Sequence, residues 1–177
     1  MRKTVTVFGS SKPTEGEEQY QFALDLGRQL AENNFDVCTG GFFGIMEAVS
    51  KGAKEKAAET IGITIDRWGG KPNKYVTREI RCDTLFERVE KLIEFGDACV
   101  VLRGGTGTLL ELASVWELIN KGIVKTKPVI CHSSMWQGIV SIMNIQLDYE
   151  NRSTELVTVM DNVEEIVNCL VTNIQPR

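Results

Sequence analysis

The chain has 177 residues, of which 42% are hydrophobic and 25% are charged, and its net charge at pH 7 is −4. This length fits one globular domain over residues 1–177, and the composition argues against a disordered segment and against a membrane protein. The acidic balance and the lack of a basic block argue against a nucleic-acid polymer as partner, but not against a small anionic ligand, since backbone dipoles bind anions whatever the net charge.

Short apolar runs rich in Val and Ile recur along the chain and predict parallel strands covered on both faces. These runs are residues 4–8, 35–38, 60–65, 98–102, 128–132 and 156–159. The first lies in "MRKTVTVFGSS", whose apolar part is short, is interrupted by Thr and ends in no secretory cleavage pattern. We therefore expect a first strand there and a cytoplasmic protein.

Helical patterns fill the intervals between the predicted strands. Apolar residues recur at three- and four-residue spacing in residues 15–34, 44–58, 83–96, 107–122, 135–147 and 161–171. The alternation of strands and helices predicts an α/β fold, a single doubly wound Rossmann-like parallel sheet with helices on both faces. The least regular stretch, residues 66–83, is expected to lie over the ligand crevice of this sheet.

The cysteines and the histidine give no sign of a metal site. The five cysteines are widely spaced and mostly lie in apolar segments, which favours reduced, buried thiols over disulfides. They are Cys38, Cys82, Cys99, Cys131 and Cys169. The only histidine, His132, ends a predicted strand and could face the crevice, but no second histidine or Cys-x-x-Cys pair accompanies it.

Three glycine-bearing loops follow three of the predicted strands: "FGSS", "TGGFFGIM" and "RGGTGT". Because the carboxyl ends of parallel strands lie on one edge of a sheet, these loops are expected to converge on a ligand crevice. The candidate binding residues are Gly9, Ser10, Ser11, Gly40, Gly41, Gly44, Met46, Gly104, Gly105, Thr106, Gly107 and Thr108. Since the motifs suggest no histidine partner for the two serines, hydrogen bonding to a phosphate suits them better than nucleophilic catalysis.

The "RGGTGT" loop has two interpretations. Its glycines can simply allow a sharp strand-to-helix turn. Alternatively, the missing side chains let a phosphate approach the free N–H groups of a helix that begins near Gly107, with the hydroxyls of Thr106 and Thr108 as further donors. The chain lacks the P-loop motif, and no G-x-G-x-x-G opens its first strand-helix unit, which disfavours P-loop NTPases and classical dinucleotide binding.

Glu111 lies about one helical turn beyond this loop, so its carboxylate is expected near any ligand held there. The alternative is a structural role, either as a carboxylate that interacts with the helix dipole or as the capping-box partner of Thr108, because T-x-x-E is that pattern. Three tryptophans, Trp68, Trp116 and Trp136, could stack on a base, although Trp116 suits the core or a dimer interface better.

"RGGTGTLLE" closely resembles the P-G-G-x-G-T-x-x-E motif of the Lonely Guy (LOG) family, phosphoribohydrolases formerly labelled lysine decarboxylases. "VFGSS", "TGGFFGIMEAVSKGA" and "GIVKTKPVI" are similar to other segments of that family, so the resemblance covers about residues 5–160. It implies a Rossmann-like homodimer that needs no metal or cofactor and hydrolyses the N-glycosidic bond of a nucleoside 5′-monophosphate. It also implies that Arg88 and Glu111 are the catalytic pair.

The implied chemistry suits both residue types. Departure of the base leaves an oxocarbenium-like ribose, which the carboxylate of Glu111 can stabilise while it orients the attacking water. The guanidinium of Arg88 can hold the phosphate or the base, although its high pKa makes it a poor proton donor. Without the resemblance, the simpler interpretation of Arg88 is a surface ion pair with Glu87 or Glu90.

Several positions depart from the family pattern. Arg103 stands in place of the motif's proline, Val89 replaces a lysine, and Leu110 replaces an acidic residue; Phe42 and Phe43 make the second loop bulkier. The acidic pattern that cytokinin-activating members carry ahead of their arginine is missing. These features resemble a divergent branch near the molybdenum-cofactor carrier proteins, which bind a phosphorylated pterin.

Two functions therefore stay open at this stage. The first is an enzyme that releases base and ribose 5-phosphate from a purine nucleoside 5′-monophosphate. The second is a protein that only binds a nucleotide or a phosphorylated pterin, and a third interpretation gives the glycines no role beyond turns. Association of the expected homodimer into larger assemblies also stays open.

Overall fold

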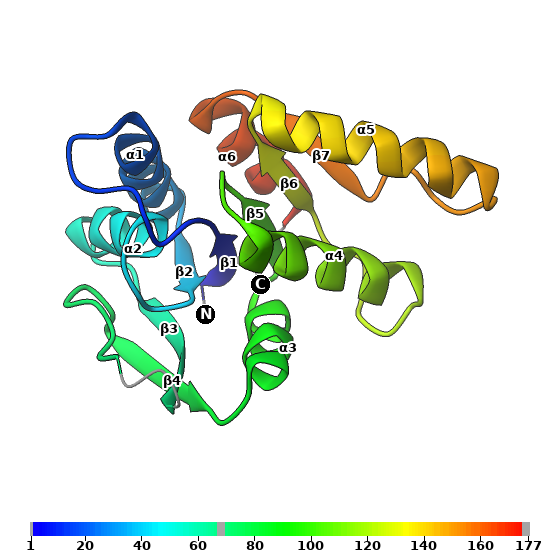
Figure 1. The fold of residues 1–177 in the computed structure, drawn as a ribbon. Coiled ribbons are helices and arrows are strands. Elements are labelled where there is room, and N and C mark those ends of the chain that lie inside the picture. The colour runs from blue at the N-terminus through cyan, green and yellow to red at the C-terminus, as the bar shows by residue number, and fades with distance from the viewer. Residues whose placement is uncertain (1, 67–69, 175–177) are drawn as a thin grey trace.

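The fold is built on one parallel sheet, and the computed structural model describes residues 2–66 and 70–174. Its seven strands lie in the order β4-β3-β2-β1-β5-β6-β7, and each neighbouring pair is parallel (Figure 1). The strands are β1 (Lys3–Phe8), β2 (Phe35–Thr39), β3 (Thr60–Ile65), β4 (Arg78–Cys82), β5 (Ala98–Val101), β6 (Val129–His132) and β7 (Val157–Met160). The predicted α/β fold with a doubly wound parallel sheet is confirmed.

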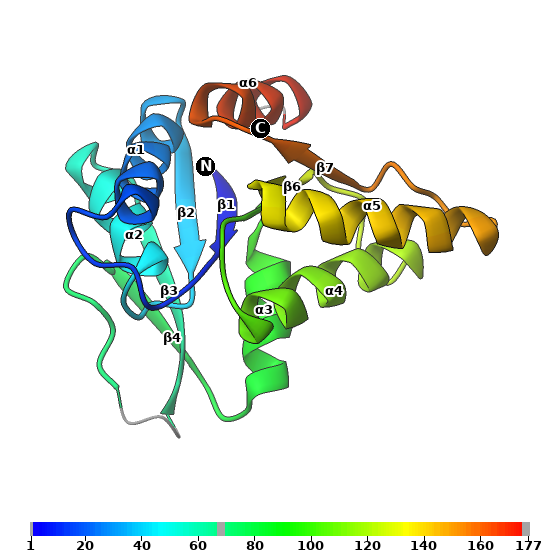
Figure 2. The same cartoon turned by 45° about the horizontal axis from the view of Figure 1, so that its top comes forward.

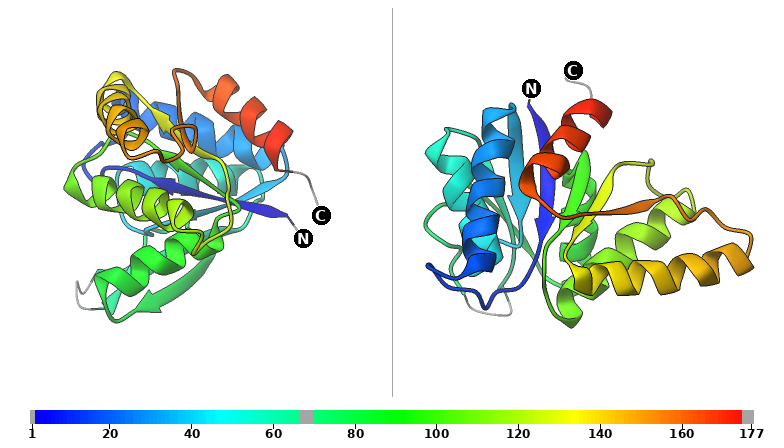
Figure 3. Two further views of the ribbon diagram at one scale, coloured as in Figure 1. Left: turned by 90° about the vertical axis from the view of Figure 1, so that its right-hand side faces the viewer. Right: turned by 90° about the horizontal axis from the view of Figure 1, so that it is seen from above.

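Helices join the strands and cover both faces of the sheet. They are α1 (Glu18–Glu32), α2 (Ile45–Glu55), α3 (Leu85–Phe95), α4 (Thr106–Asn120), α5 (Ser134–Tyr149) and α6 (Val163–Asn173). Buried residues of α1, α2 and α6 form one core cluster, and those of α3, α4 and α5 form a second one. In the left view of Figure 3, α1 and α6 lie above the sheet and α3 lies below it. Each predicted helical segment overlaps one of these helices, and α4, α5 and α6 extend one or two residues beyond the predicted segments.

The continuous apolar runs have a direct cause in this arrangement. Successive side chains of a strand point to opposite faces, and here both faces are covered. In β1, Val5 and Val7 belong to the first core cluster, whereas Phe8 belongs to the second. A central strand therefore needs apolar residues at nearly every position, which is the pattern that predicted six of the seven strands.

The seventh strand, β4, contradicts the expectation that residues 66–83 are irregular. Its sequence, "REIRC", carries charged side chains because β4 is an edge strand that pairs only with β3. Arg78 and Arg81 are exposed, and Arg81 makes an ion pair with Glu79. An edge strand with one partly open face does not show the continuous apolar run of a covered strand, and charged residues at such an edge discourage pairing with another chain.

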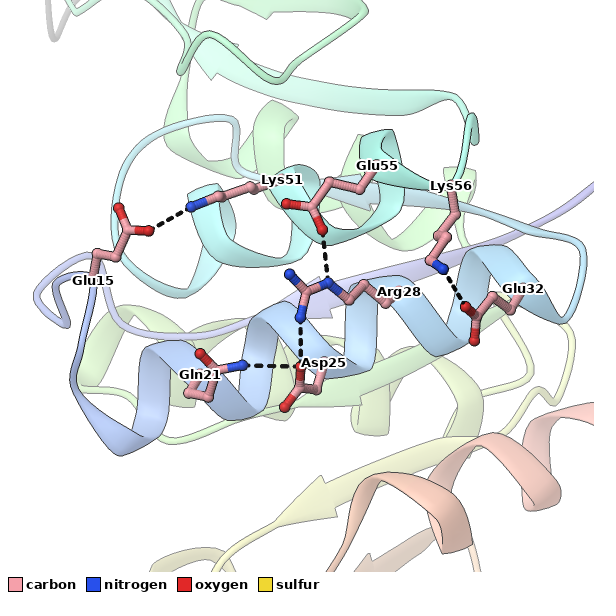
Figure 4. A network of polar contacts seen from close by, with 8 residues as sticks. All are labelled: Glu15, Gln21, Asp25, Arg28, Glu32, Lys51, Glu55 and Lys56. Atoms are coloured by element: carbon pink, nitrogen blue, oxygen red, sulfur yellow. Dashed lines mark hydrogen bonds and ion pairs between the residues drawn. The ribbon is translucent and has the colours of Figure 1, made fainter.

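The close packing of α1 against α2 positions the two loops that precede them. Gly27 of α1 and Gly52 of α2 lie where a Cβ atom would clash with backbone oxygens of the opposite helix. Ion pairs then join the exposed sides of the two helices, including Arg28 with Glu55 at 2.7 Å (Figure 4). Such exposed pairs contribute only about 0–1 kcal/mol each, so the approach of the two backbones is the main constraint.

Side chains cap the N-termini of two helices. The Thr84 side chain accepts a hydrogen bond from the backbone N–H of Glu87 at the start of α3. Asn162 does the same for Glu165 at the start of α6. Among the helices of the described ranges, none is both long and apolar enough to span a bilayer.

Candidate functional site

The candidate site lies at the carboxyl ends of β1, β2 and β5. The order of the strands reverses between β1 and β5, because the chain continues outward from β1 through β2 to β4 and then returns to β5 on the other side. Ligands of open α/β sheets bind at such a switch point. Backbone hydrogen bonds tie the loops there together: Ser10 N–H donates to the Arg103 carbonyl (3.0 Å), and Ile45 N–H donates to the Ser10 carbonyl (2.9 Å). The structure thus brings the three glycine loops together.

Several glycines of these loops are required by the fold itself, among them Gly9 and Gly44. Gly44 has a positive φ of 67°, and a Cβ atom there would clash with the backbone of Ser10 and Ser11. A Cβ atom at Gly9 would lie 2.5 Å from the Cγ2 atom of Ile45. For these positions the interpretation as turn glycines is sufficient, because side chains would push the first two loops apart.

Gly105 and Gly107 are different. Gly105 is extended, with φ −96°, and Gly107 lies in the first turn of α4; neither has a positive φ. A Cβ atom at either position would meet no heavy atom within 4 Å. Gly107 even weakens the helix, because glycine is about 1 kcal/mol less favourable than alanine there. Neither clash nor backbone conformation explains these two glycines, which leave open space above the N-terminus of α4.

The N-terminus of α4 offers free hydrogen-bond donors beside this space. The first backbone N–H groups of a helix have no intrahelical acceptors, and Gly105, the residue before α4, has no side chain to cap them. Thr106 is exposed, whereas Thr108 is buried against Gly104. Helix N-termini with this geometry bind phosphate and carboxylate groups.

Arg88 lies in the interior beside these loops and makes no surface pair with Glu87 or Glu90. It is 5% exposed, and its Nε atom donates to the Ile63 carbonyl (2.7 Å). Its Nη1 atom lies 3.4 Å from Oε1 of Glu111. A Cβ atom at Gly40 would overlap the guanidinium, so glycine at this position makes room for Arg88.

Glu111 projects from the second turn of α4 toward Arg88, and its side chain is 12% exposed. Burial raises the pKa of Glu111 to about 7, although the nearby Arg88 acts in the opposite direction. Burial also lowers the pKa of Arg88, but a guanidinium remains charged at neutral pH. The capping-box interpretation is wrong, because α4 begins at Thr106 and Thr108 is not its capping residue.

The second loop packs over this pair. The centroid of the Phe42 ring lies 6.0 Å from Cζ of Arg88, within the range of a cation–π contact. Met46 lies beside Gly40, and its Sδ atom would be 2.7 Å from a Cβ atom there. Gly41 follows Thr39, whose hydroxyl accepts a hydrogen bond from the Gly41 N–H (3.1 Å).

The tryptophan and cysteine candidates lie mainly in the core, and two of the thiols, Cys38 and Cys99, lie close enough to Arg88 and Glu111 to interact with them electrostatically. Trp116 is buried in the second core cluster, as is Trp136, whose Nε1 atom donates to the Leu102 carbonyl (3.0 Å); Trp68 lies outside the described residues. Burial raises the pKa of three thiols, those of Cys38, Cys99 and Cys131, to about 12, so they are unreactive. Within the described ranges, no cluster of three or more His, Cys, Asp or Glu side chains could hold a metal ion.

Comparison with known proteins identifies the family. The family model described as the SLOG cluster4 family matches residues 2–167, which is most of the chain. The chain belongs to this family. The resemblance to the LOG phosphoribohydrolases is also confirmed by relatives that carry this name.

One relative of this SLOG chain is the cytokinin riboside 5′-monophosphate phosphoribohydrolase of Mycobacterium tuberculosis. The two are 28% identical over 92% of this chain and 90% of the relative. The rice protein named cytokinin riboside 5′-monophosphate phosphoribohydrolase LOG is 31% identical over 72% of this chain and 53% of its own length. The solved structure of the molybdenum cofactor binding protein from Rippkaea orientalis has a TM-score of 0.77 at 22% identity, covers 97% of each chain and shares the fold.

Sequence analysis missed one buried residue of this SLOG site, Asn73. It is 5% exposed, and its Nδ2 atom donates to the carbonyls of Gly41 (3.1 Å) and Phe42 (2.7 Å). Its own N–H donates to Gly41 as well (2.8 Å). Asn73 thus anchors part of the irregular connection to the second glycine loop. In the sequence, "KPN" indicates only a turn. Nothing in this local pattern predicts that the asparagine side chain is buried.

Proposed function

We propose that the chain hydrolyses the N-glycosidic bond of a nucleoside 5′-monophosphate and releases a free base and ribose 5-phosphate. The observation that carries this proposal is the buried Arg88–Glu111 pair beside the open N-terminus of α4. The names of the relatives, cytokinin riboside 5′-monophosphate phosphoribohydrolases, support the same reaction class.

The 5′-phosphate would bind above the N-terminus of α4. The space over Gly105 and Gly107 lets phosphate oxygens reach the free N–H groups, and the exposed Thr106 hydroxyl is a further donor. The Ser10–Ser11 loop lies across from it, tied to Arg103 by a backbone hydrogen bond. The remaining predicted contacts, Gly9, Gly40, Gly41, Gly44, Met46, Gly104 and Thr108, would shape the walls of the crevice.

Glu111 would act on the ribose. Its carboxylate form can stabilise the positive charge that develops as the base departs and can orient the attacking water. With a pKa of about 7, a large fraction of the Glu111 side chain is ionised at neutral pH. A pKa close to the working pH is also the most effective one for transferring protons.

Arg88 would hold the nucleotide and keep Glu111 in place. The Ile63 carbonyl and Glu111 fix two of its nitrogen atoms, and the guanidinium also lies beside Gly40 and Phe42. A fixed positive charge there can offset negative charge on the departing base, and the proton for that base comes from the attacking water, which releases it as it adds to the ribose.

The test is incubation of the purified chain with AMP, other purine monophosphates and N6-substituted analogues, followed by chromatography for free base. We expect release from at least one monophosphate and none from the matching nucleoside, because the nucleoside lacks the phosphate. Intact substrate in every reaction would contradict the proposal.

A second candidate function is binding without turnover. The supporting observation is Val89, which is 4% exposed and part of the apolar core, where the family pattern has a lysine next to the arginine. A carrier of a nucleotide or phosphorylated pterin would bind AMP or a pterin monophosphate without changing it. Binding would then survive Glu111→Ala but weaken when Gly107 is made bulky.

We also propose that the chain forms a homodimer through α3 and α4. A groove between these helices is lined mainly by apolar side chains, and Phe86 at its rim is 73% exposed. Figures 1 and 2 show α3 and α4 next to each other on one side of the molecule. Light scattering of the wild type is expected to give a dimer, and Phe86→Asp a monomer; a monomeric wild type would contradict this.

A further inference from the structure

A cavity lies beside the crevice, on the side away from Arg88 and Glu111. Its volume is about 180 Å³, far more than the roughly 10–15 Å³ that one water requires. Its walls come from α1, from the residue after Gly44, and from the segments that follow β5 and β6. The lining residues are Glu18, Gln19, Phe22, Ile45, Leu102, Arg103, His132 and Ser133.

The cavity adjoins the proposed phosphate site directly. Leu102 and Arg103 immediately precede the "GGTGT" loop, and Ile45 is the residue whose side chain packs against Gly9. The cavity walls from α1 belong to the face of the sheet opposite to α3 and α4. A phosphate at the N-terminus of α4 would therefore have Glu111 on one side and this cavity on the other.

Arg103 brings a positive charge without an ion-pair partner among the described residues to this cavity. Its side chain is exposed, and within residues 2–66 and 70–174 no ion pair or hydrogen bond engages its guanidinium. Glu18 is the one acidic residue of the lining; it is also exposed and can turn toward solvent. An unpaired guanidinium at a cavity mouth is suited to bidentate binding of a phosphate or carboxylate.

The wall after β6 adds polar groups. The Ser133 hydroxyl is buried and has no hydrogen-bond partner in the described part of the chain, and this residue precedes α5, whose first N–H groups lack intrahelical acceptors. His132 stacks on Phe22 with ring centroids 3.9 Å apart, and its Nδ1 atom lies 3.1 Å from the Met160 carbonyl.

We infer that this cavity is a second anion subsite, which binds a group attached to the 5′-phosphate of the nucleotide, and that Arg103 is its specificity residue. The substrate class then includes nucleoside 5′-diphosphates and nucleotides with a comparable second anionic group. This inference rests on the proposed binding of the 5′-phosphate at α4. The motif's proline at position 103 would supply no such charge.

The test compares the affinities of AMP and ADP by calorimetry on the full chain. The wild type is expected to bind ADP about tenfold more tightly than AMP, the size of one charge-assisted hydrogen bond. Arg103→Gln is expected to lower ADP affinity about tenfold and to change AMP affinity less than twofold.

Lys12→Gln is the matched control, because Lys12 is an exposed cation near the first loop that does not line the cavity. It is expected to leave the ratio of ADP to AMP affinity unchanged. Equal affinity of the wild type for the two nucleotides, or an equal loss for both in Arg103→Gln, would overturn the subsite while leaving the proposed function intact. Failure of both nucleotides to bind would overturn the proposed function together with the subsite.

Discussion

The loop after β2 and the loop after β5 both bring glycines to the same edge of the sheet, but for different reasons. Gly44, in the first, has a positive φ and no room for a side chain. Gly105 and Gly107, in the second, have ordinary backbone conformations and empty space around them. Because these two glycines flank the free N–H groups at the start of α4, we assign the phosphate to that N-terminus.

The largest expected effect is on folding. Gly44→Ala forces a side chain into a positive-φ position and against the backbone of Ser10 and Ser11. We expect the free energy of unfolding to fall by about 3 kcal/mol, which lowers the melting temperature by roughly 6–12 °C for a chain of this size. Urea unfolding measures this loss. A variant as stable as the wild type would show that the loop does not need this glycine.

The next effect is on activity and comes from Gly40→Ala. The added methyl group would overlap the Arg88 guanidinium and displace it from Glu111. A displacement of about 1 Å in a catalytic group costs about 100-fold in rate, so we expect kcat/KM to fall by about that factor. Gly138→Ala is the control, because a Cβ atom there meets nothing within 4 Å. Full activity of Gly40→Ala would remove Arg88 from the mechanism.

Gly107→Ala is expected to change stability and binding in opposite directions. Alanine is the better helix former, so the free energy of unfolding should rise by about 0.5–1 kcal/mol. Its methyl group enters the space assigned to the phosphate, so AMP affinity should fall about tenfold. Calorimetry and urea unfolding on one preparation measure both. Unchanged AMP affinity in this variant would favour the interpretation of the loop as a plain turn.

The smallest effect is on the pH dependence. Because burial raises the pKa of Glu111 to about 7 and the carboxylate is the active form, kcat/KM should rise with pH and reach half its maximum near pH 7. A rate that is flat from pH 5 to pH 9 would assign the chemistry to another group.

The raised pKa of Glu111 also affects stability. Between its ordinary pKa of 4.5 and about pH 7, the folded state binds more protons than the unfolded state, so the free energy of unfolding falls as the pH rises through this range.

Much of this architecture was visible in the sequence because covered strands and amphipathic helices leave strong patterns. β5 is a continuous apolar run, and β1 alternates valine with threonine before Phe8; both of their faces are buried. β4 was not predicted, because an edge strand can carry solvent-exposed charged side chains such as Arg78 and Arg81. The pattern of apolar residues in a strand depends on how far the strand is buried. An edge strand is only partly buried, so its sequence carries a weaker pattern.

The site was less visible than the fold. Arg88 reads as one of many charged residues on a helix, and only the family resemblance distinguished it from a surface ion pair before its burial was seen. Asn73 and the cavity at Ser133 depend on contacts between segments far apart in the chain, with no local pattern to indicate them. Local motifs therefore predicted the loops, and tertiary packing decided what surrounds them.

The central claim is that the Arg88–Glu111 pair cleaves the nucleotide held at α4. The most direct measurement quantifies the free base and ribose 5-phosphate formed from the best monophosphate at pH 8 by the wild type, Glu111→Gln and the exposed control on the same helix, Glu117→Gln. We predict equal amounts of the two products from the wild type and the control, and at least a 100-fold lower rate for Glu111→Gln. Equal rates for all three proteins, or nucleotide that binds and stays intact, would contradict the account.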